Sequence, residues 1–237
     1  MAASKRDAFP RSTPVKLRSA GVELGCTYMD ALWERASKMS ARKTSGDSLT
    51  VLLAPSWGES SLLCKYGERI LDILAETGYR IIIRPHPQSM TSDIDVVKPL
   101  MERYPESERL KWNFDNDNFD VLNEADLMIS DFSSVIWDYV LVFDRPLIYA
   151  DTEFDKSPYD AAWLDEEMWK FRVLPSIGIP LREEDFPSMK ELIRSAVSDT
   201  GLAEGREQAR KEAWAHIGES ASLTADYLLN KYDSLTA

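Results

Sequence analysis

The sequence predicts an α/β protein built on a parallel sheet with helices on both faces. Short apolar runs alternate with longer amphipathic segments between residues 49 and 150, at the spacing of repeated strand–helix–strand units. The apolar runs are continuous and do not alternate in polarity, which is typical of strands covered on both sides. The 237 residues, 44% of them hydrophobic, suffice for one large domain or two small ones.

Five of these apolar runs are predicted to be strands. Each is short, rich in aliphatic or β-branched residues, and bounded by prolines or polar residues. In chain order the runs are LTVLLAP (49–55), YRIIIRPHP (79–87), RLKWN (109–113), DLMIS (126–130) and RPLIYA (145–150).

Apolar residues at helical spacing predict the helices. A short helix over residues 26–39 precedes the first strand, and a longer one over 60–78 ends at Gly78, a common residue after a helix end. The segment 93–104 is helical but interrupted by Pro99. Further helices are expected at 119–125, 133–143, 187–199 and 203–232, with an acidic, aromatic loop over 151–171.

Charge and composition divide the chain and exclude some classes of protein. Residues 1–20 are expected to be a disordered basic arm, 21–48 a linker with one helix, and 49–237 the folded domain. The net charge of −12 argues against nucleic-acid binding. The basic arm is expected to be a solvated tail, with peripheral contact to an anionic membrane as the alternative. Without an apolar spanning run or signal peptide, we expect a cytoplasmic protein, at most associated with the inner face of the membrane.

The stretch SDFSS (130–134) stands where a buried strand gives way to a helix. The first turn of a helix offers unbonded N–H groups and a partial positive charge, and Ser133 and Ser134 add two hydroxyls. This pattern suits a diphosphate without a metal or a basic side chain. Asp131 would repel a phosphate, so it is a candidate contact whose alternative is to cap the helix. The serines have the same alternative.

Two other strand ends are expected at the same edge of the sheet. The segment RPHP fixes His86 between two prolines, where it could contact a phosphate, transfer a proton, or serve only as a structural histidine. Arg84 could meet a phosphate or pair with an acid. Ser56 and Trp57, in APSWGESS, follow the first strand. GxGxxG, GxxxxGK[ST] and GxSxG motifs do not occur, which disfavours dinucleotide-dependent, P-loop and serine-hydrolase chemistry.

Several stretches together resemble the CDP-glycerol glycerophosphotransferases, the teichoic-acid polymerases and their relatives. They are VLLAPSW, IIIRPHP, ISDFSSVIWDYVLVFDRPLIYA and IGESAS, preceded by GVELGCTYMDAL. The resemblance implies a GT-B architecture, two Rossmann-like domains around a cleft, of which residues 49–237 would be the donor-binding half. It further implies that His86, Ser133 and Ser134 contact the diphosphate of CDP-glycerol, the donor substrate, and that no resident cofactor or metal is needed.

The same resemblance implies a missing half, because the segment before Leu49 is too short for a second Rossmann-like domain. We therefore expect a fragment of a longer enzyme, a split enzyme with a separate N-terminal-half chain as partner, or a remnant that binds without catalysis. The acceptor would be a polyol-phosphate polymer and the donor a CDP-activated polyol. The alternatives are another GT-B glycosyltransferase or UDP-sugar epimerase domain, or a non-catalytic nucleotide-binding or interaction module.

Overall fold

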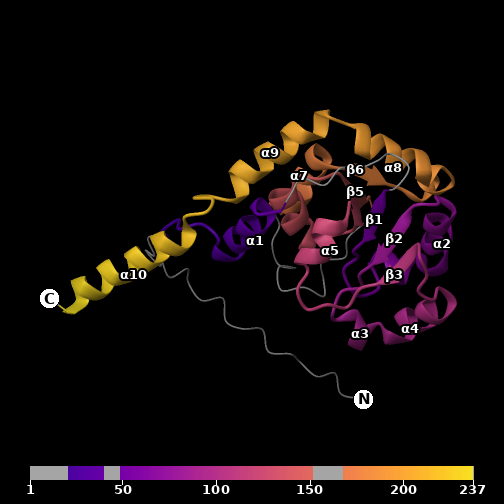
Figure 1. Ribbon diagram of the computed structural model, residues 1–237, viewed down its shortest axis with the longest axis horizontal. Helices are drawn as coiled ribbons and strands as arrows, with labels where there is room; N and C mark the ends of the chain where they lie inside the picture. The colour runs from indigo at the N-terminus through magenta and orange to yellow at the C-terminus, as the bar shows by residue number, and fades with distance from the viewer. Residues whose placement is uncertain (1–20, 40–48, 152–167, 237) are drawn as a thin grey trace, which may run out of the picture.

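The computed structural model describes residues 21–39, 49–151 and 168–236, and these form one parallel sheet with helices around it (Figure 1). The sheet has six strands in the order β3-β2-β1-β4-β5-β6, and every neighbouring pair is parallel. The strands are β1 (Thr50–Leu53), β2 (Arg80–Ile83), β3 (Leu110–Trp112), β4 (Leu127–Ser130), β5 (Leu147–Ala150) and β6 (Ile179–Leu181). This is the strand order of a Rossmann fold.

The predicted fold class and all five predicted strands are confirmed, but β6 was missed. It has only three residues, with Pro180 at its centre, and follows a stretch that we expected to remain irregular. Pro180 is tolerated because β6 lies at the edge of the sheet and pairs only with β5. The basic arm and most of the acidic loop that we predicted lie outside the described residues.

Most helices in the first two thirds of the chain follow the prediction, although α3 was not predicted and the backbone of α2 is not helical at Gly67. The long helix α2 ends before Gly78, which has φ of +75° as expected. The predicted interruption at Pro99 is wrong, because α4 continues through it. Pro99 is on the exposed side, so the carbonyl that loses its partner can meet water. The bounds are α1 (Thr27–Ser37), α2 (Leu62–Glu76), α3 (Ser89–Ser92), α4 (Ile94–Arg103), α5 (Phe119–Glu124), α6 (Val135–Trp137) and η1 (Asp138–Phe143).

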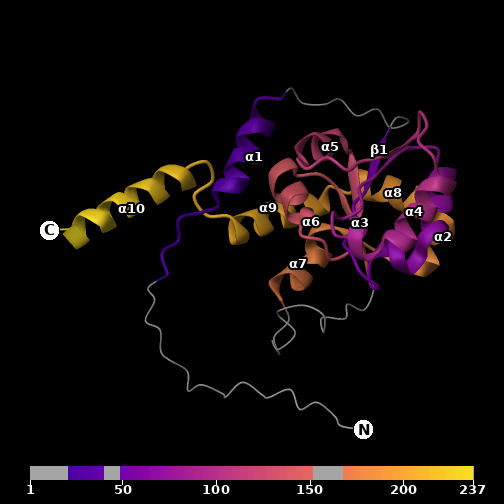
Figure 2. The same cartoon turned by 90° about the horizontal axis from the view of Figure 1, so that it is seen from below.

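The last third differs more from the prediction. The end of the expected loop is helical, because α7 (Trp169–Ile177) begins inside it. The single helix expected over 203–232 is two helices, separated at His216 and Gly218, whose φ values are +53° and +82°. Two such residues cannot continue a right-handed helix. The remaining elements are η2 (Glu183–Ser188), α8 (Met189–Ser198), α9 (Gly201–Ala213) and α10 (Ser220–Thr236). In both views α10 extends away from the sheet (Figure 2).

The two faces of the sheet bury separate hydrophobic cores. Within β1, Val51 and Leu53 face the helices α2, α4 and α8, whereas Leu52 faces α5, η1 and α7. Both cores are almost fully excluded from water, which explains why apolar residues occupy consecutive positions in the central strands β1, β2 and β4. None of the helices in the described part of the chain is long and apolar enough to cross a membrane.

The topology places the strand ends that matter for function. β1 and β4 are neighbours at the centre of the sheet, although β2 and β3 lie between them in the sequence. The chain therefore runs outward in one direction from β1 and in the other from β4. Such a switch point leaves a crevice at the carboxyl ends of the two strands, which is where open α/β sheets bind ligands.

Candidate functional site

Asp131 ties together the loops that follow β1 and β4. Its Oδ1 accepts hydrogen bonds from the backbone N–H groups of Ser56 (2.8 Å), Phe132 (2.7 Å) and Ser133 (3.2 Å), and its Oδ2 accepts one from Leu62 at the start of α2 (3.0 Å). The residue is buried, and burial raises the pKa of its carboxyl while the four donors oppose that shift. Asp131 thus acts as a buried hydrogen-bond acceptor that fixes the floor of the crevice.

The two serines of SDFSS differ in their exposure. Ser133 is buried, with 7% of its surface accessible, and its N–H already donates to Asp131. Ser134 is exposed and immediately precedes α6. The N–H groups of Ile136 and Trp137 donate to the carbonyls of Ser133 and Ser134, which starts the helix. No side chain of the pair caps α6, so both hydroxyls stand at its N-terminus without the capping role that was our alternative.

His86 lies in the loop after β2, against the loop after β1. Its ring centroid is 6.5 Å from that of Trp57, and its Nδ1 accepts a hydrogen bond from the Gln88 N–H (3.1 Å). The neutral ring must then carry its proton on Nε2. Burial lowers the pKa of His86, Asp93 opposes this shift, and Arg84 adds to it. His86 is therefore a neutral donor near pH 7.

Electrostatics link the histidine side of the crevice to the serine side. Asp93, which raises the pKa of His86, accepts a hydrogen bond from the Gly58 N–H (2.9 Å) in the loop after β1. Burial raises the pKa of the Cys64 thiol, and both Asp93 and Asp131 raise it further. The Cys64 thiol at the start of α2 is therefore near enough to both Asp93 and Asp131 for their carboxylates to raise its pKa. The three predicted loops converge as expected, around the N-terminus of α2.

Arg84 contacts the loop after β3 and not the loops after β1 and β4. Its guanidinium donates to the Asn113 side chain and, at 2.8 Å, to the carbonyl of Asp115. It thus braces the loop after β3, and burial lowers its pKa. Among the residues of 21–39, 49–151 and 168–236, no group of three or more His, Cys, Asp or Glu is arranged to hold a metal ion.

A lysine that the sequence reading did not consider lines a small hollow beside Ser133. Lys170 is the second residue of α7, and burial lowers the pKa of its ammonium group. The indole rings of Trp137 and Trp169 lie 4.9 Å apart and hold α7 against α6. The lining residues are Asp131, Phe132, Ser133, Ile136, Trp137, Lys170, Phe171 and Leu174. Lys170 follows Ser133 by 37 positions, so only the fold brings the two together.

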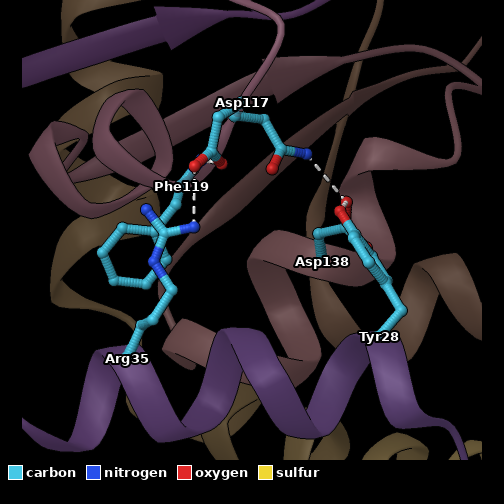
Figure 3. Close-up of polar contacts among 6 residues, drawn as sticks. Tyr28, Arg35, Asp117, Phe119 and Asp138 are labelled. Atoms are coloured by element: carbon cyan, nitrogen blue, oxygen red, sulfur yellow. Dashed lines mark hydrogen bonds and ion pairs between the residues drawn. The ribbon is translucent and has the colours of Figure 1, made fainter.

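Helix α1 docks on the strand-end loops through polar contacts (Figure 3). The Tyr28 hydroxyl donates to Asp138 (3.0 Å), which also accepts from the Asn118 side chain (2.9 Å). On the same helix, Arg35 forms an ion pair with Asp117 (2.7 Å). The contacts join α1 to the loop before α5 and to the start of η1. The segment that enters the domain is therefore part of the architecture around the crevice.

Asp30 fastens the other side of α1 to the C-terminal segment. Its carboxylate accepts hydrogen bonds from the Trp214 indole (3.0 Å) and the N–H groups of Gly218 (2.8 Å) and Ser220 (2.8 Å). Gly25 lies so close that an added Cβ would be 2.2 Å from the Ser220 Oγ. GVELGCTYMDAL and IGESAS, which are almost 200 residues apart in the sequence, thus form one unit.

The sequence profile of a family described as CDP-glycerol:poly(glycerophosphate) glycerophosphotransferase matches residues 17–163. The chain belongs to this family. The matched region spans α1 and the first five strands, so it includes His86, Ser133 and Ser134 and ends before Lys170. The resemblance deduced from the sequence is thereby confirmed. No match was found among curated protein sequences.

Solved structures share the fold of this glycerophosphotransferase-family chain at low sequence identity. A protein described as a UDP-N-acetylglucosamine 2-epimerase from Listeria monocytogenes aligns with a TM-score of 0.51 and 13% identity, over 90% of this chain and 54% of that one. The wall teichoic acid polymerase TagF aligns with a TM-score of 0.49 and 19% identity, over 87% and 47%. The chain thus spans about half the length of these structures. The first likeness supports the expected architecture, one Rossmann-like domain of a GT-B fold.

Proposed function

We propose that this chain is the donor-binding domain of a glycerophosphotransferase and that it binds CDP-glycerol or a similar CDP-polyol. Membership of the family supports the class of donor. The observation that carries the proposal is the arrangement at the switch point. Asp131 clamps the loops after β1 and β4, and the hydroxyls of Ser133 and Ser134 stand at the start of the adjoining helix. Hydroxyls at a helix N-terminus suit a diphosphate.

In the proposed reaction, an acceptor hydroxyl attacks the phosphorus that carries the polyol. The bond from that phosphorus to the bridging oxygen breaks, and CMP leaves with the electron pair. The Ser133 and Ser134 hydroxyls would stabilise the charge that develops on CMP, with His86 donating its Nε2 proton into a hydrogen bond. Ser56 and Trp57 border the same crevice and would limit where the donor can lie.

The acceptor side of the reaction is assigned to a partner. We propose that a second domain or chain provides the base that takes the acceptor proton and binds the polyol-phosphate polymer. The complex would work on a cell-envelope polymer at the inner face of the membrane. The isolated chain should then bind the donor without robust transfer. Polymer formation by the purified chain would refute this division of labour.

Amide chemical shifts offer a direct test of the donor class. CDP-glycerol should shift the signals of residues 130–135 and of His86, while signals of α10 serve as the internal control because that helix extends away from the crevice. UDP-N-acetylglucosamine is the competitor. Shifts with the UDP-sugar and none with CDP-glycerol would favour a glycosyltransferase or epimerase domain instead. Donor shifts without turnover, even after a partner is added, would favour a binding module.

A further inference from the structure

Helix α10 carries an apolar stripe that nothing in the described part of the chain covers. Every residue from 225 to 236 is exposed. The exposed fractions of Leu228, Tyr232 and Leu235 are 60%, 65% and 76%. Figures 1 and 2 show the helix extending away from the sheet, so these side chains stand clear of the domain. Contiguous exposed apolar surface of this kind marks an interaction site.

The stripe has the spacing of a helix that pairs with another helix. Its members lie alternately four and three positions apart, which is the 3.5-residue repeat of a coiled-coil seam. At 100° per residue, Asp226, Asn230 and Asp233 lie on the opposite face of α10. The side of α10 that meets α1 carries Ser220, whose N–H donates to Asp30. The seam consists of Ala221, Ala225, Leu228, Tyr232 and Leu235.

The two halves of the seam differ in size, and this difference favours a second copy of the same chain. The first half has two alanines, and the second half has only large side chains. If two copies of α10 run antiparallel about a two-fold axis, Tyr232 of each copy lies opposite Ala221 of the other, and Leu228 lies opposite Ala225. Large side chains opposite small ones interdigitate without voids. A parallel pair would set Tyr232 against Tyr232 and leave a gap between the alanines.

Charge also favours the antiparallel arrangement. Each chain has a net charge of −12, and the folded domain lies at the N-terminal end of α10. A parallel pair would hold two acidic domains side by side. An antiparallel pair holds them at opposite ends of a helix of 17 residues, which is about 25 Å long. This length exceeds the ~10 Å over which exposed charges repel each other at 0.1 M salt.

We propose that two copies of this chain pair through α10, antiparallel, with the apolar stripe as their common seam. The proposal goes beyond donor binding and does not depend on it. Trp33 and Ile217, both partly exposed near the start of α10, would then lie close to Leu235 of the second copy. The helix lies outside residues 17–163, which the family profile matches, so the pairing is inferred for this chain and not for the family. An interface of one helix is small, so the dimer should exchange with the monomer.

Sedimentation equilibrium of the full chain over a series of concentrations measures the pairing. The wild-type chain should dimerise with a dissociation constant in the micromolar range, as a small interface does. Leu228→Glu should raise this constant roughly tenfold or more, because it places a charge at the centre of the seam. Asn230→Glu is the matched control, since it introduces the same side chain on the opposite face of the same helix. Its dissociation constant should stay within about twofold of the wild-type value.

A spin label at position 234, in a chain whose Cys26 and Cys64 are changed to serine, reports the orientation. The two labels should lie more than about 20 Å apart in the antiparallel pair and next to each other in a parallel one. A wild-type chain that stays monomeric at every concentration would overturn the proposal and assign the stripe to a different partner. Equal weakening by the two glutamate variants, or adjacent labels, would also overturn it. None of these results bears on CDP binding, which is measured separately. Urea unfolding of each variant confirms that the compared proteins are folded.

Discussion

The carboxylate of Asp131 accepts a hydrogen bond from the Ser56 N–H at 2.8 Å, and this contact joins two loops that are 75 residues apart in the sequence. The same carboxylate holds the first residue of α2 and the turn that carries Ser133. Removing one of its acceptor oxygens should therefore affect the whole floor of the crevice. All four donors are backbone N–H groups, so their positions are set by the fold, and a change of side-chain rotamers cannot compensate for a lost acceptor.

Asp131→Asn should lower the free energy of unfolding by about 1–3 kcal/mol. The carboxylate accepts hydrogen bonds on both oxygens, whereas the asparagine amide replaces one of these oxygens with an NH₂ group, which would face a backbone N–H donor without bonding to it. Urea denaturation measures the change. Asp226→Asn, an exposed aspartate on α10, is the control and should unfold like the wild type. A stability of Asp131→Asn equal to that of the control would show that Asp131 does not hold the loops.

Asp30→Asn should weaken the attachment of α1 in a manner that depends on pH. Burial acts to raise the pKa of Asp30, but hydrogen bonds from Ser220, Gly218 and Trp214 outweigh it and leave the pKa below its ordinary value of 3.8. Because the folded-state pKa is depressed, the stabilisation is complete above pH 3.8 and is lost as pH falls through the folded-state value. The mutant should lose about 1–3 kcal/mol at pH 7. The difference from wild type should shrink only below pH 3.8; a constant difference down to pH 3 would contradict this assignment.

Gly25→Ala tests the close contact between α1 and the C-terminal segment. Gly25 has φ of +83°, and a Cβ there would lie 2.2 Å from the Ser220 Oγ and 2.6 Å from the Ala215 carbonyl oxygen. The substitution should cost about 1–3 kcal/mol of unfolding free energy. Gly21→Ala is the matched control, because nothing lies within 4 Å of its added methyl group. Equal melting temperatures for the two variants would mean that the two segments are not packed as described.

His86→Ala should reduce CDP affinity by about 0.5–1.5 kcal/mol at pH 8, where the ring is a neutral donor. Since burial lowers the pKa of His86 below 6.5, the ring in the free protein reaches half protonation only below that pH, and there the loss should grow. The protonation of CDP also changes with pH, but it affects both proteins equally. The ratio of wild-type to mutant affinity therefore isolates the contribution of His86. His216→Asn is the control, an exposed histidine with φ of +53°, which Asn tolerates. A ratio that is largest at pH 8 would refute this role.

The elements with the clearest sequence signals were predicted correctly. Strands such as IIIRP and helices such as 60–78 are marked by local residue patterns, and the order of the apolar runs was sufficient to predict a parallel sheet. The strand β6 was missed because three residues with a central proline carry no such pattern. The separation of α9 from α10 was missed because it depends on positive φ at both His216 and Gly218, and a single glycine inside a helical pattern does not by itself predict a break.

The candidate site was predictable only in part, for a related reason. Strand ends with a histidine or serines could be recognised one loop at a time, because each follows its own strand. The role of Asp131 depends on donors from two other segments, and the position of Lys170 near Ser133 depends on how α7 packs against α6. Such contacts join residues tens of positions apart, and no local spacing encodes them.

The most direct test of donor binding at the switch point is a calorimetric titration of CDP into the wild-type chain, Ser133→Ala and Ser134→Ala, with and without EDTA. Each substitution should weaken binding by about 1–3 kcal/mol, as expected for a lost hydrogen bond to a charged group. The double variant should lose less than the sum, because both hydroxyls serve one diphosphate. EDTA should leave every affinity unchanged. Unchanged affinity in both serine variants would contradict the account, and binding lost with EDTA would assign the phosphate to a cation instead.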